Sequence, residues 1–170
     1  ESTLAFGRAE EPPPQLARFE LAPLVAEVIE AERLATPEGE VALVEEIPAG
    51  FVLRADSEQL FRVLSNLVRN ARQAITATGN TGRVTVSARE EDEEWWIFVT
   101  DTGPGLPPRA REHLFLAFRG GVAKGGSGLG LAIAAELVRG HGGRLELTRS
   151  DETGTEFAIC LPRSAPASPA

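Results

Sequence analysis

The sequence has a single cysteine, no long hydrophobic run and no signal-peptide pattern. Cys160 is the only cysteine among 170 residues, so the chain can form no internal disulfide. It also lacks metal-ligand spacing, and we expect a buried structural thiol. The longest run of apolar residues and glycines, near 128–135, is far shorter than the ~20 residues that span a bilayer. We therefore expect a soluble, cytoplasmic chain.

Basic residues are fewer than acidic ones, but many of them are concentrated in two stretches of the chain. The chain has 17 Lys and Arg against 25 Asp and Glu, a net charge of -8, which argues against nucleic acid as a partner. Five arginines and no acid lie between Gln59 and Arg89, and four basic residues with Glu112 as the one acid lie between Thr102 and Ala135. In an acidic protein these stretches fit a site for one anion, and they also fit a solvated helix face.

Several familiar nucleotide-binding motifs are absent. The sequence contains no G-x-x-x-x-G-K-[ST], no G-x-G-x-x-G after a strand, and no H-R-D and D-F-G pair. Glycine is nevertheless concentrated, because eleven of the 17 glycines lie between Gly103 and Gly143. Each glycine costs backbone entropy, so such a cluster indicates tight turns or a close approach of the backbone to a ligand.

An apolar helix is predicted to begin inside this glycine cluster. Residues 129–138 are nearly all apolar and follow Gly126-Ser127-Gly128 directly. The free N–H groups and the positive dipole end of such a helix point at the preceding loop, which is an arrangement that holds phosphate. The first hypothesis is therefore a nucleotide site.

The remaining patterns predict an α+β fold. Three prolines at 12–14 read as an extended spacer. Helices are expected at about 23–36, at 57–76 after an Asp56 N-cap, and at 129–138. Strands are expected at 18–21, 41–47, 51–54, 84–88, 95–100, 144–148 and 155–161, with a Pro48-Ala49-Gly50 turn between the second and third. We predict a two-layer sandwich in which a mixed, mostly antiparallel sheet carries three helices on one face.

Three amide side chains share one face of the helix at 57–76. Asn66 and Asn70 are four residues apart and Gln73 follows three later, so they lie within about 60° of one another. Amide oxygens on a rigid helix can ligate Mg²⁺, with phosphates and water completing its shell. Taken alone, the pair of asparagines also fits ordinary surface residues.

Asp101 ends a predicted strand and opens an Asp-Thr-Gly triplet. A carboxylate there suits an exocyclic amine such as that of adenine, and Gly103 and Gly105 allow a tight turn against a flat base. The same triplet carries the catalytic carboxylate of aspartic proteases. That enzyme would need a second triplet or a homodimer, and it leaves the asparagines and the glycines at 126–130 without a role.

In combination, these motifs resemble the N, G1, F and G2 boxes of sensor histidine kinases. The corresponding residues are 66–71, 101–106, Phe115 with Phe118, and 126–131, and Gly154-Thr155-x-Phe157 resembles the last glycine element. The boxes stand in the family's order over about 19–163. The resemblance implies the Bergerat fold of the GHKL ATPases, with a lid at about 119–125. The Gln-Ala sequence at Gln73 is similar to the nitrogen-regulation-like branch.

The resemblance also implies a role for each matched residue. Asn70 would be the principal Mg²⁺ ligand, Asn66 a second metal or water-shell contact in the catalytic set, and Arg119 or Lys124 the contact to the γ-phosphate. Asp101 would read adenine, and the glycines would cradle phosphate. Together with Asn66 and Asn70, the implied nucleotide contacts are Gln73, Asp101, Gly103, Gly105, Leu106, Phe118, Gly126, Ser127, Gly128, Leu129, Gly130 and Thr155. Many relatives have Lys at position 73, for which Arg69 or Arg72 is a candidate substitute.

The implied activity is that of a protein-histidine kinase without its acceptor. Members that hydrolyse ATP have a Glu where this chain has Asn66, which is a poor general base, so slow hydrolysis is expected. Neither His113 nor His141 matches the acceptor pattern. We expect residues 1–15 to be the end of a dimerisation helix with its Pro-rich linker, 16–163 the ATP-binding catalytic domain, and 164–170 a disordered tail.

The implied partners follow from that activity. They are ATP with Mg²⁺, the histidine-containing dimerisation domain of a homodimeric parent protein, and the receiver domain of a response regulator. The parent can be a membrane-anchored sensor with this part in the cytosol. The isolated domain is expected not to autophosphorylate. The alternatives are an anti-sigma-type serine kinase or switch and a degenerate nucleotide-binding module of the same superfamily.

Overall fold

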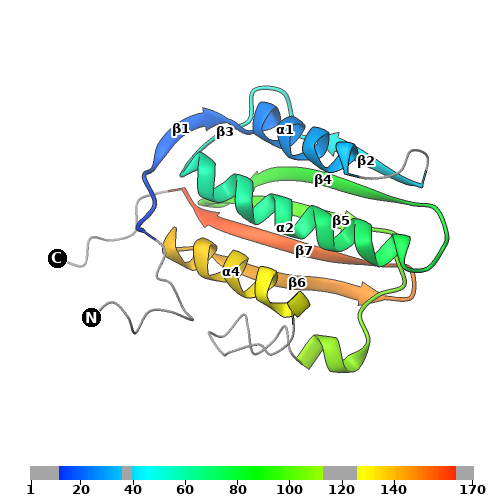
Figure 1. Ribbon diagram of the computed structural model, residues 1–170. Coiled ribbons are helices and arrows are strands. Elements are labelled where there is room, and N and C mark those ends of the chain that lie inside the picture. Colours follow the sequence, from blue (N-terminus) through cyan, green and yellow to red (C-terminus); the bar gives the residue numbers. More distant parts are fainter. Residues whose placement is uncertain (1–11, 36–39, 113–125, 164–170) are drawn as a thin grey trace.

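Three helices cover one face of a mixed five-stranded sheet (Figure 1). The computed structural model describes residues 12–35, 40–112 and 126–163, with the backbone alone for 126–129. In chain order the elements are β1 (Ala17–Glu20), α1 (Leu21–Leu34), β2 (Val41–Glu46), β3 (Val52–Ala55), α2 (Ser57–Thr76), β4 (Gly82–Glu91), β5 (Glu94–Asp101), α4 (Gly126–Gly140), β6 (Arg144–Asp151) and β7 (Gly154–Pro162). This arrangement confirms the predicted α+β sandwich.

The large sheet has the order β2-β4-β5-β7-β6, and β1 pairs with β3 in a separate ribbon. Only the β2–β4 pair is parallel, so the sheet is mostly antiparallel as expected. The turn at Pro48–Gly50 is present, with the Phe51 N–H donating to the Pro48 carbonyl at 3.1 Å. The strands on either side of it nevertheless join different sheets, because β3 turns the fully buried Leu53 and Ala55 into the core alongside β1.

The helix α2 lies between α1 and α4 across the sheet (Figure 1). It begins where predicted, because the Asp56 carboxylate accepts the Gln59 N–H at 3.0 Å and caps the first turn. Its apolar stripe is buried against the sheet and consists of Leu60, Val63, Leu64, Leu67, Val68, Ala71 and Ile75. Each such side chain contributes about 1.5–3 kcal/mol on burial, so the rotation of α2 about its axis is strongly determined.

A buried ion pair joins α2 to α1. The Arg72 guanidinium donates twice to Glu32 Oε2, at 2.8 and 2.6 Å, and the two side chains are only 12% and 6% exposed. Arg69 approaches the same carboxylate at 3.7 Å. Both arginines are candidates for the phosphate contact that Gln73 lacks, and that role stays a prediction. Their pairing with Glu32 accounts for part of the basic stretch on this helix.

The segment before β1 is hydrogen-bonded to the beginning of α2. The Gln15 N–H donates to Asp56 Oδ2 at 2.8 Å, and the Gln59 side-chain amide donates to the Pro12 carbonyl at 3.0 Å. The Asp56 N–H donates to Nε2 of the buried His141 at 3.0 Å, while His141 Nδ1 lies 2.9 Å from the Leu137 carbonyl. Pro12–Gln15, the first turn of α2 and the end of α4 therefore form one connected corner.

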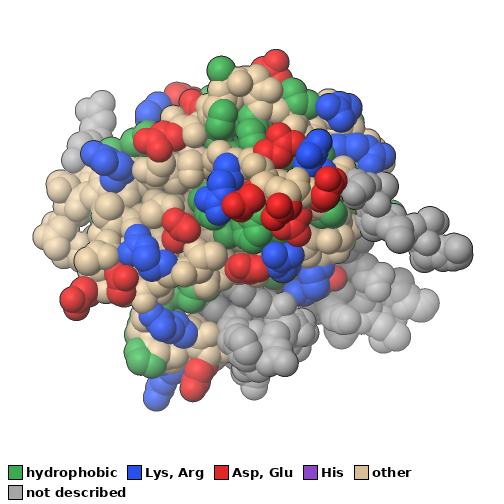
Figure 2. Space-filling model, turned by 180° about the vertical axis from the view of Figure 1, so that it is seen from behind, with side chains coloured by type: hydrophobic (Ala, Val, Ile, Leu, Met, Phe, Trp, Pro, Cys, Tyr) green, Lys and Arg blue, Asp and Glu red, His purple; other side chains and the backbone are tan. Residues whose placement is uncertain are grey.

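The opposite face of the sheet carries no helix among the described elements, and basic and acidic side chains alternate over it (Figure 2). Trp96 and Phe98 stack there with ring centroids 6.0 Å apart, and Arg144 and Arg89 lie over the two rings. Cys160, opposite Trp96 on β7, is the expected buried thiol, and burial raises its pKa to about 12. None of the described helices has the length and hydropathy to cross a membrane.

Candidate functional site

Asp101 is the last residue of β5 and is only 5% exposed. It lies opposite Thr155 of β7, which is 4% exposed. The Gly103 N–H donates to Asp101 Oδ1 at 2.8 Å. Burial raises the pKa of the Asp101 carboxyl, although hydrogen bonds from the Gly103 and Thr155 backbones and the charge of Arg149 oppose this shift. The sequence thus predicted correctly a carboxylate at a strand end, and the structure adds that it is buried.

The loop after Asp101 is packed against the β6–β7 hairpin without room for side chains at two glycines. Gly105 has φ +85°, and a Cβ there would lie 2.3 Å from the Asp151 carbonyl oxygen. A Cβ on Gly154 would lie 2.0 Å from the Asp101 carbonyl oxygen. Both approaches are far below any tolerated contact, so the loop 102–107 and the hairpin behave as one packed unit.

Ser150, which belongs to none of the sequence motifs, is hydrogen-bonded to several parts of this unit. The Leu106 N–H donates to Ser150 Oγ at 2.8 Å, and Ser150 Oγ lies 3.2 Å from Thr155 Oγ1. The guanidinium of Arg111, in the helical segment at 108–112, donates to the Ser150 carbonyl. The signal that could have found Ser150 is its place in the hairpin, because it lies directly opposite Thr155 in the β6–β7 register.

The asparagines of α2 lie between the two glycine-rich segments. A Cβ on Gly130 of α4 would lie 3.2 Å from Asn66 Oδ1, so the two helices meet at this point. One turn beyond Asn70 on the same face is Ala74, whose Cβ is 3.9 Å from where a Cβ on Gly103 would lie. Both asparagines are half-buried, whereas Gln73 is exposed. Asn66 and Asn70, here called the asparagine row, therefore lie along a line from α4 to the loop that follows Asp101.

The helix α4 begins at Gly126, which confirms a helix N-terminus inside the glycine cluster. The N–H groups of its first three residues, Gly126, Ser127 and Gly128, have no partner within the helix. Phe115, Phe118, Arg119 and Lys124 lie outside the described residues, as does the expected lid at 119–125. The roles expected for those residues stay predictions.

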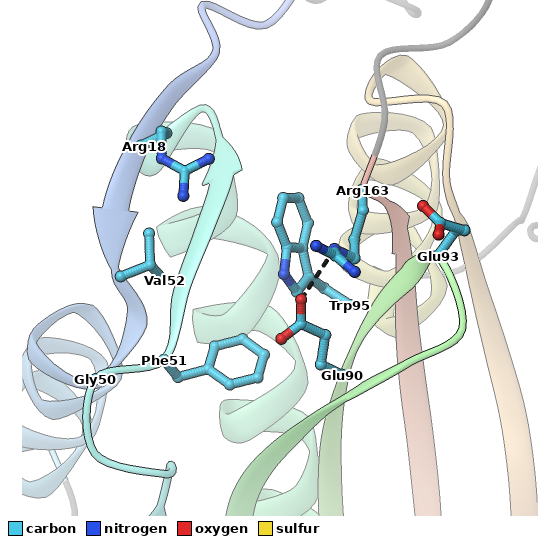
Figure 3. Close-up of a pocket in the computed structure, with 8 residues that line it drawn as sticks. All are labelled: Arg18, Gly50, Phe51, Val52, Glu90, Glu93, Trp95 and Arg163. Carbon is cyan, nitrogen blue, oxygen red and sulfur yellow. Dashed lines mark ion pairs between the residues drawn. The ribbon is translucent and has the colours of Figure 1, made fainter.

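A cavity of about 390 Å³ lies at the other end of β5 (Figure 3). Trp95, near the start of that strand, forms part of its wall, together with Arg18 of β1 and Phe51 before β3. Arg163 and Glu90 are ion-paired across it at 2.9 Å. Because Asp101 ends the same strand six residues later, this cavity is distinct from the candidate site.

The described residues contain no group of three His, Cys, Asp or Glu side chains that could hold a metal ion. A metal bound at the asparagine row would take amide oxygens together with a ligand's own oxygens. That donor set fits Mg²⁺, which takes few protein ligands and keeps phosphates and water in its shell.

We predict that Asp101→Asn is stabilising at pH 7. The folded pKa of Asp101 lies above its unfolded value of about 3.9, so the native state binds the extra proton between the two values. Stability is therefore lost as the pH rises through that window, and a neutral amide avoids the loss. Urea denaturation of both proteins should show the gain at pH 7 and its disappearance near pH 3.5.

Asp151→Asn is the matched control with the opposite sign. Hydrogen bonds from the Thr153 side chain and backbone are the leading causes that lower the pKa of Asp151. Its carboxylate therefore stabilises the fold above the unfolded pKa, and the amide should lower stability at pH 7. A loss of stability in Asp101→Asn that is larger at pH 7 than at low pH would contradict the prediction.

Comparison with known proteins identifies the family. The family model described as "Histidine kinase-, DNA gyrase B-, and HSP90-like ATPase" matches residues 55–165. The sensory histidine kinase/phosphatase NtrB of Salmonella typhimurium is 40% identical over 117 residues, which are 63% of this chain and 32% of that protein. This chain thus spans about a third of that curated relative.

Solved structures agree with this relationship. The full-length ShkA structure, described as a complex with AMPPNP, has a TM-score of 0.75 and 28% identity, covering 99% of this chain and 36% of that one. The catalytic domain of the histidine kinase ThkA has a TM-score of 0.72 and 26% identity, covering 88% of this chain and 96% of that one. The chain therefore belongs to the family of histidine kinase-, DNA gyrase B- and HSP90-like ATPases and, within it, to the sensor histidine kinase type.

Proposed function

We propose that this chain is the Mg-ATP-binding catalytic domain of a sensor histidine kinase and that it donates the γ-phosphoryl group to a histidine on a dimerisation domain of its parent protein. The observation that carries the proposal is the position of the asparagine row. Asn66 contacts the glycine-opened helix α4 at Gly130, and the same face of α2 reaches Gly103 beside the buried Asp101. A nucleotide along this row would have Asp101 at its base and the first turn of α4 at its phosphates.

The described residues have chemistry suited to these roles. Asp101 accepts a hydrogen bond from the amino group of adenine, and Thr155 lies beside it on β7. The loop of Gly103, Gly105 and Leu106 lines the base. The free N–H groups of α4 hold phosphate oxygens. Bound between Asn70, Asn66 and the phosphates, Mg²⁺ would neutralise charge on the transferring group. Arg119 or Lys124 would complete the γ-phosphate contacts.

Phosphoryl transfer in this site rests on positioning and electrostatics. Asn66 has an amide where a water-activating carboxylate would be needed for hydrolysis, and it is packed against Gly130. The domain therefore holds ATP with little turnover until an acceptor histidine is placed in line with the γ-phosphate. The partners that this proposal implies are the acceptor domain of a homodimeric parent and the receiver domain of a response regulator. The name of the relative, a sensory histidine kinase/phosphatase, supports a histidine as the acceptor.

Calorimetric titration with ATP, while ADP is followed in the same sample, tests the proposal. We expect binding that depends on Mg²⁺ with negligible turnover. A purified acceptor hairpin from the parent protein should then gain phosphate. Absence of ATP binding would contradict the nucleotide site, rapid turnover would indicate a hydrolytic member of the family, and no transfer at saturating Mg-ATP would exclude the kinase.

Asp101→Asn should weaken ATP binding about ten- to a hundredfold. The substitution replaces a charged acceptor with a neutral amide, and hydrogen bonds to charged groups contribute about 1.5–3 kcal/mol. Asp92→Asn is the control, because Asp92 lies at the exposed tip of the β4–β5 hairpin, at the other end of β5. Asn tolerates the φ of 56° found there. Unchanged ATP affinity in Asp101→Asn would show that adenine is read elsewhere.

Gly130→Ala should weaken Mg-dependent ATP binding several-fold. The new methyl group would lie 3.2 Å from Asn66 Oδ1, so the Asn66 amide has to shift by a few tenths of an ångström. Gly140→Ala, in the same helix, is the matched control because its methyl group meets only Pro14 Cδ at an ordinary 3.9 Å. Calorimetry with and without Mg²⁺ separates a loss of metal-dependent binding from a general loss of ATP binding. An equal loss of ATP binding in the presence and absence of Mg²⁺ would count against a metal contact at Asn66.

A further inference from the structure

Ser150 is a junction between four parts of the chain. It lies on β6, its hydroxyl oxygen accepts the Leu106 N–H at 2.8 Å, and the same oxygen lies 3.2 Å from the hydroxyl of Thr155 on β7. Its carbonyl accepts the Arg111 guanidinium. One small, half-buried side chain thus ties the end of the loop 102–107 to the two strands beside it.

The Ser150 hydroxyl can both donate and accept hydrogen bonds at this junction. A hydroxyl has one proton and two lone pairs. With one lone pair occupied by the Leu106 N–H, Ser150 retains its proton and a second lone pair for Thr155 Oγ1, so either hydroxyl can be the donor of this bond. Thr155 of β7 lies directly opposite Asp101 in the β5–β7 register, so the bond between Ser150 and Thr155 lies beside the end of β5.

Backbone contacts and side-chain packing support this loop alongside Ser150. Gly105 presses against the carbonyl of Asp151, the residue after Ser150, and its φ of +85° makes the turn between Asp101 and Leu106 tight. The loop is held at its start by the Thr102 N–H bond to the Arg83 carbonyl and the Gly103 N–H bond to Asp101 Oδ1. It is held at its end by the Leu106 N–H bond to Ser150 Oγ and by packing of the Leu106 side chain against the core. Removal of the bond to Ser150 frees the Leu106 N–H, and the end of the loop then constrains the Asp101 carboxylate less from that side.

We propose that Ser150 is a positioning residue for base recognition, which holds the Asp101–Leu106 loop and Thr155 at one point so that the Asp101 carboxylate keeps its orientation toward the amino group of the base. This inference rests on the proposed function, because it takes Asp101 as the adenine reader. It predicts coupling between the Ser150 hydroxyl and the amino group of the nucleotide. A general role in folding would affect all nucleotides alike.

A thermodynamic cycle tests this coupling. The dissociation constants of ATP and of purine ribonucleoside triphosphate, which lacks the amino group, are measured with Mg²⁺ for the wild type and for Ser150→Ala. We expect Ser150→Ala to bind ATP about fivefold more weakly, as for the loss of one hydrogen bond, and the amino-free nucleotide nearly as well as the wild type. Ser150→Thr, which retains the hydroxyl, should restore the preference for ATP.

Thr148→Ala is the matched control on the same strand. Among the described residues, the Thr148 hydroxyl is hydrogen-bonded to Glu156 of β7, at 3.1 Å to the carbonyl and 3.0 Å to the carboxylate, and not to the loop 102–107. It should leave the ratio of the two dissociation constants unchanged. An unchanged ratio in Ser150→Ala, with ATP still bound by the wild type, would overturn this inference alone. Failure of the wild type to bind ATP would overturn the proposed function together with it.

Discussion

The burial of the apolar stripe of α2 against the sheet is the constraint on which the rest of the site depends. Seven buried side chains from Leu60 to Ile75 determine the rotation of the helix. Once that rotation is set, Asn66 and Asn70 can only face the side where α4 and the loop after Asp101 lie. The Glu32–Arg72 pair holds the opposite flank of the helix to α1. Hydrophobic packing thus positions the asparagine row, although the asparagines are not part of the apolar stripe.

The other half of the site depends on strand register. Asp101 and Thr155 come together because β5 and β7 pair over their whole lengths, and Ser150 joins them through the β6–β7 hairpin. A shift of one residue in either pair would turn Asp101 or Thr155 to the wrong face. The close contacts of Gly105 and Gly154 with neighbouring carbonyls leave little freedom for such a shift. The raised pKa of Asp101 reflects the burial that this packing causes.

Features set by local sequence were predictable, and features set by distant pairing were not. The Asp56 cap, the helix that begins at Gly126 and the strand that ends at Asp101 each have a signal within a few residues. The separation of β2 and β3 into different sheets depends on partners 32 to 41 residues away, and the Glu32–Arg72 pair spans 40 residues. Ser150 was missed because its importance comes from Leu106 and Thr155.

The corner formed by Pro12–Gln15, Asp56 and His141 has a mechanical consequence. Gln15 and Pro12 are bonded to the capping residue of α2 and to its first turn, and His141 bonds the same backbone from the end of α4. A pull or twist on the chain that precedes Pro12 therefore acts first on the N-terminus of α2. Because a helix transmits displacement along its axis as a nearly rigid rod, such a force reaches Asn66 about three turns away and Asn70 about four turns away without passing through the sheet.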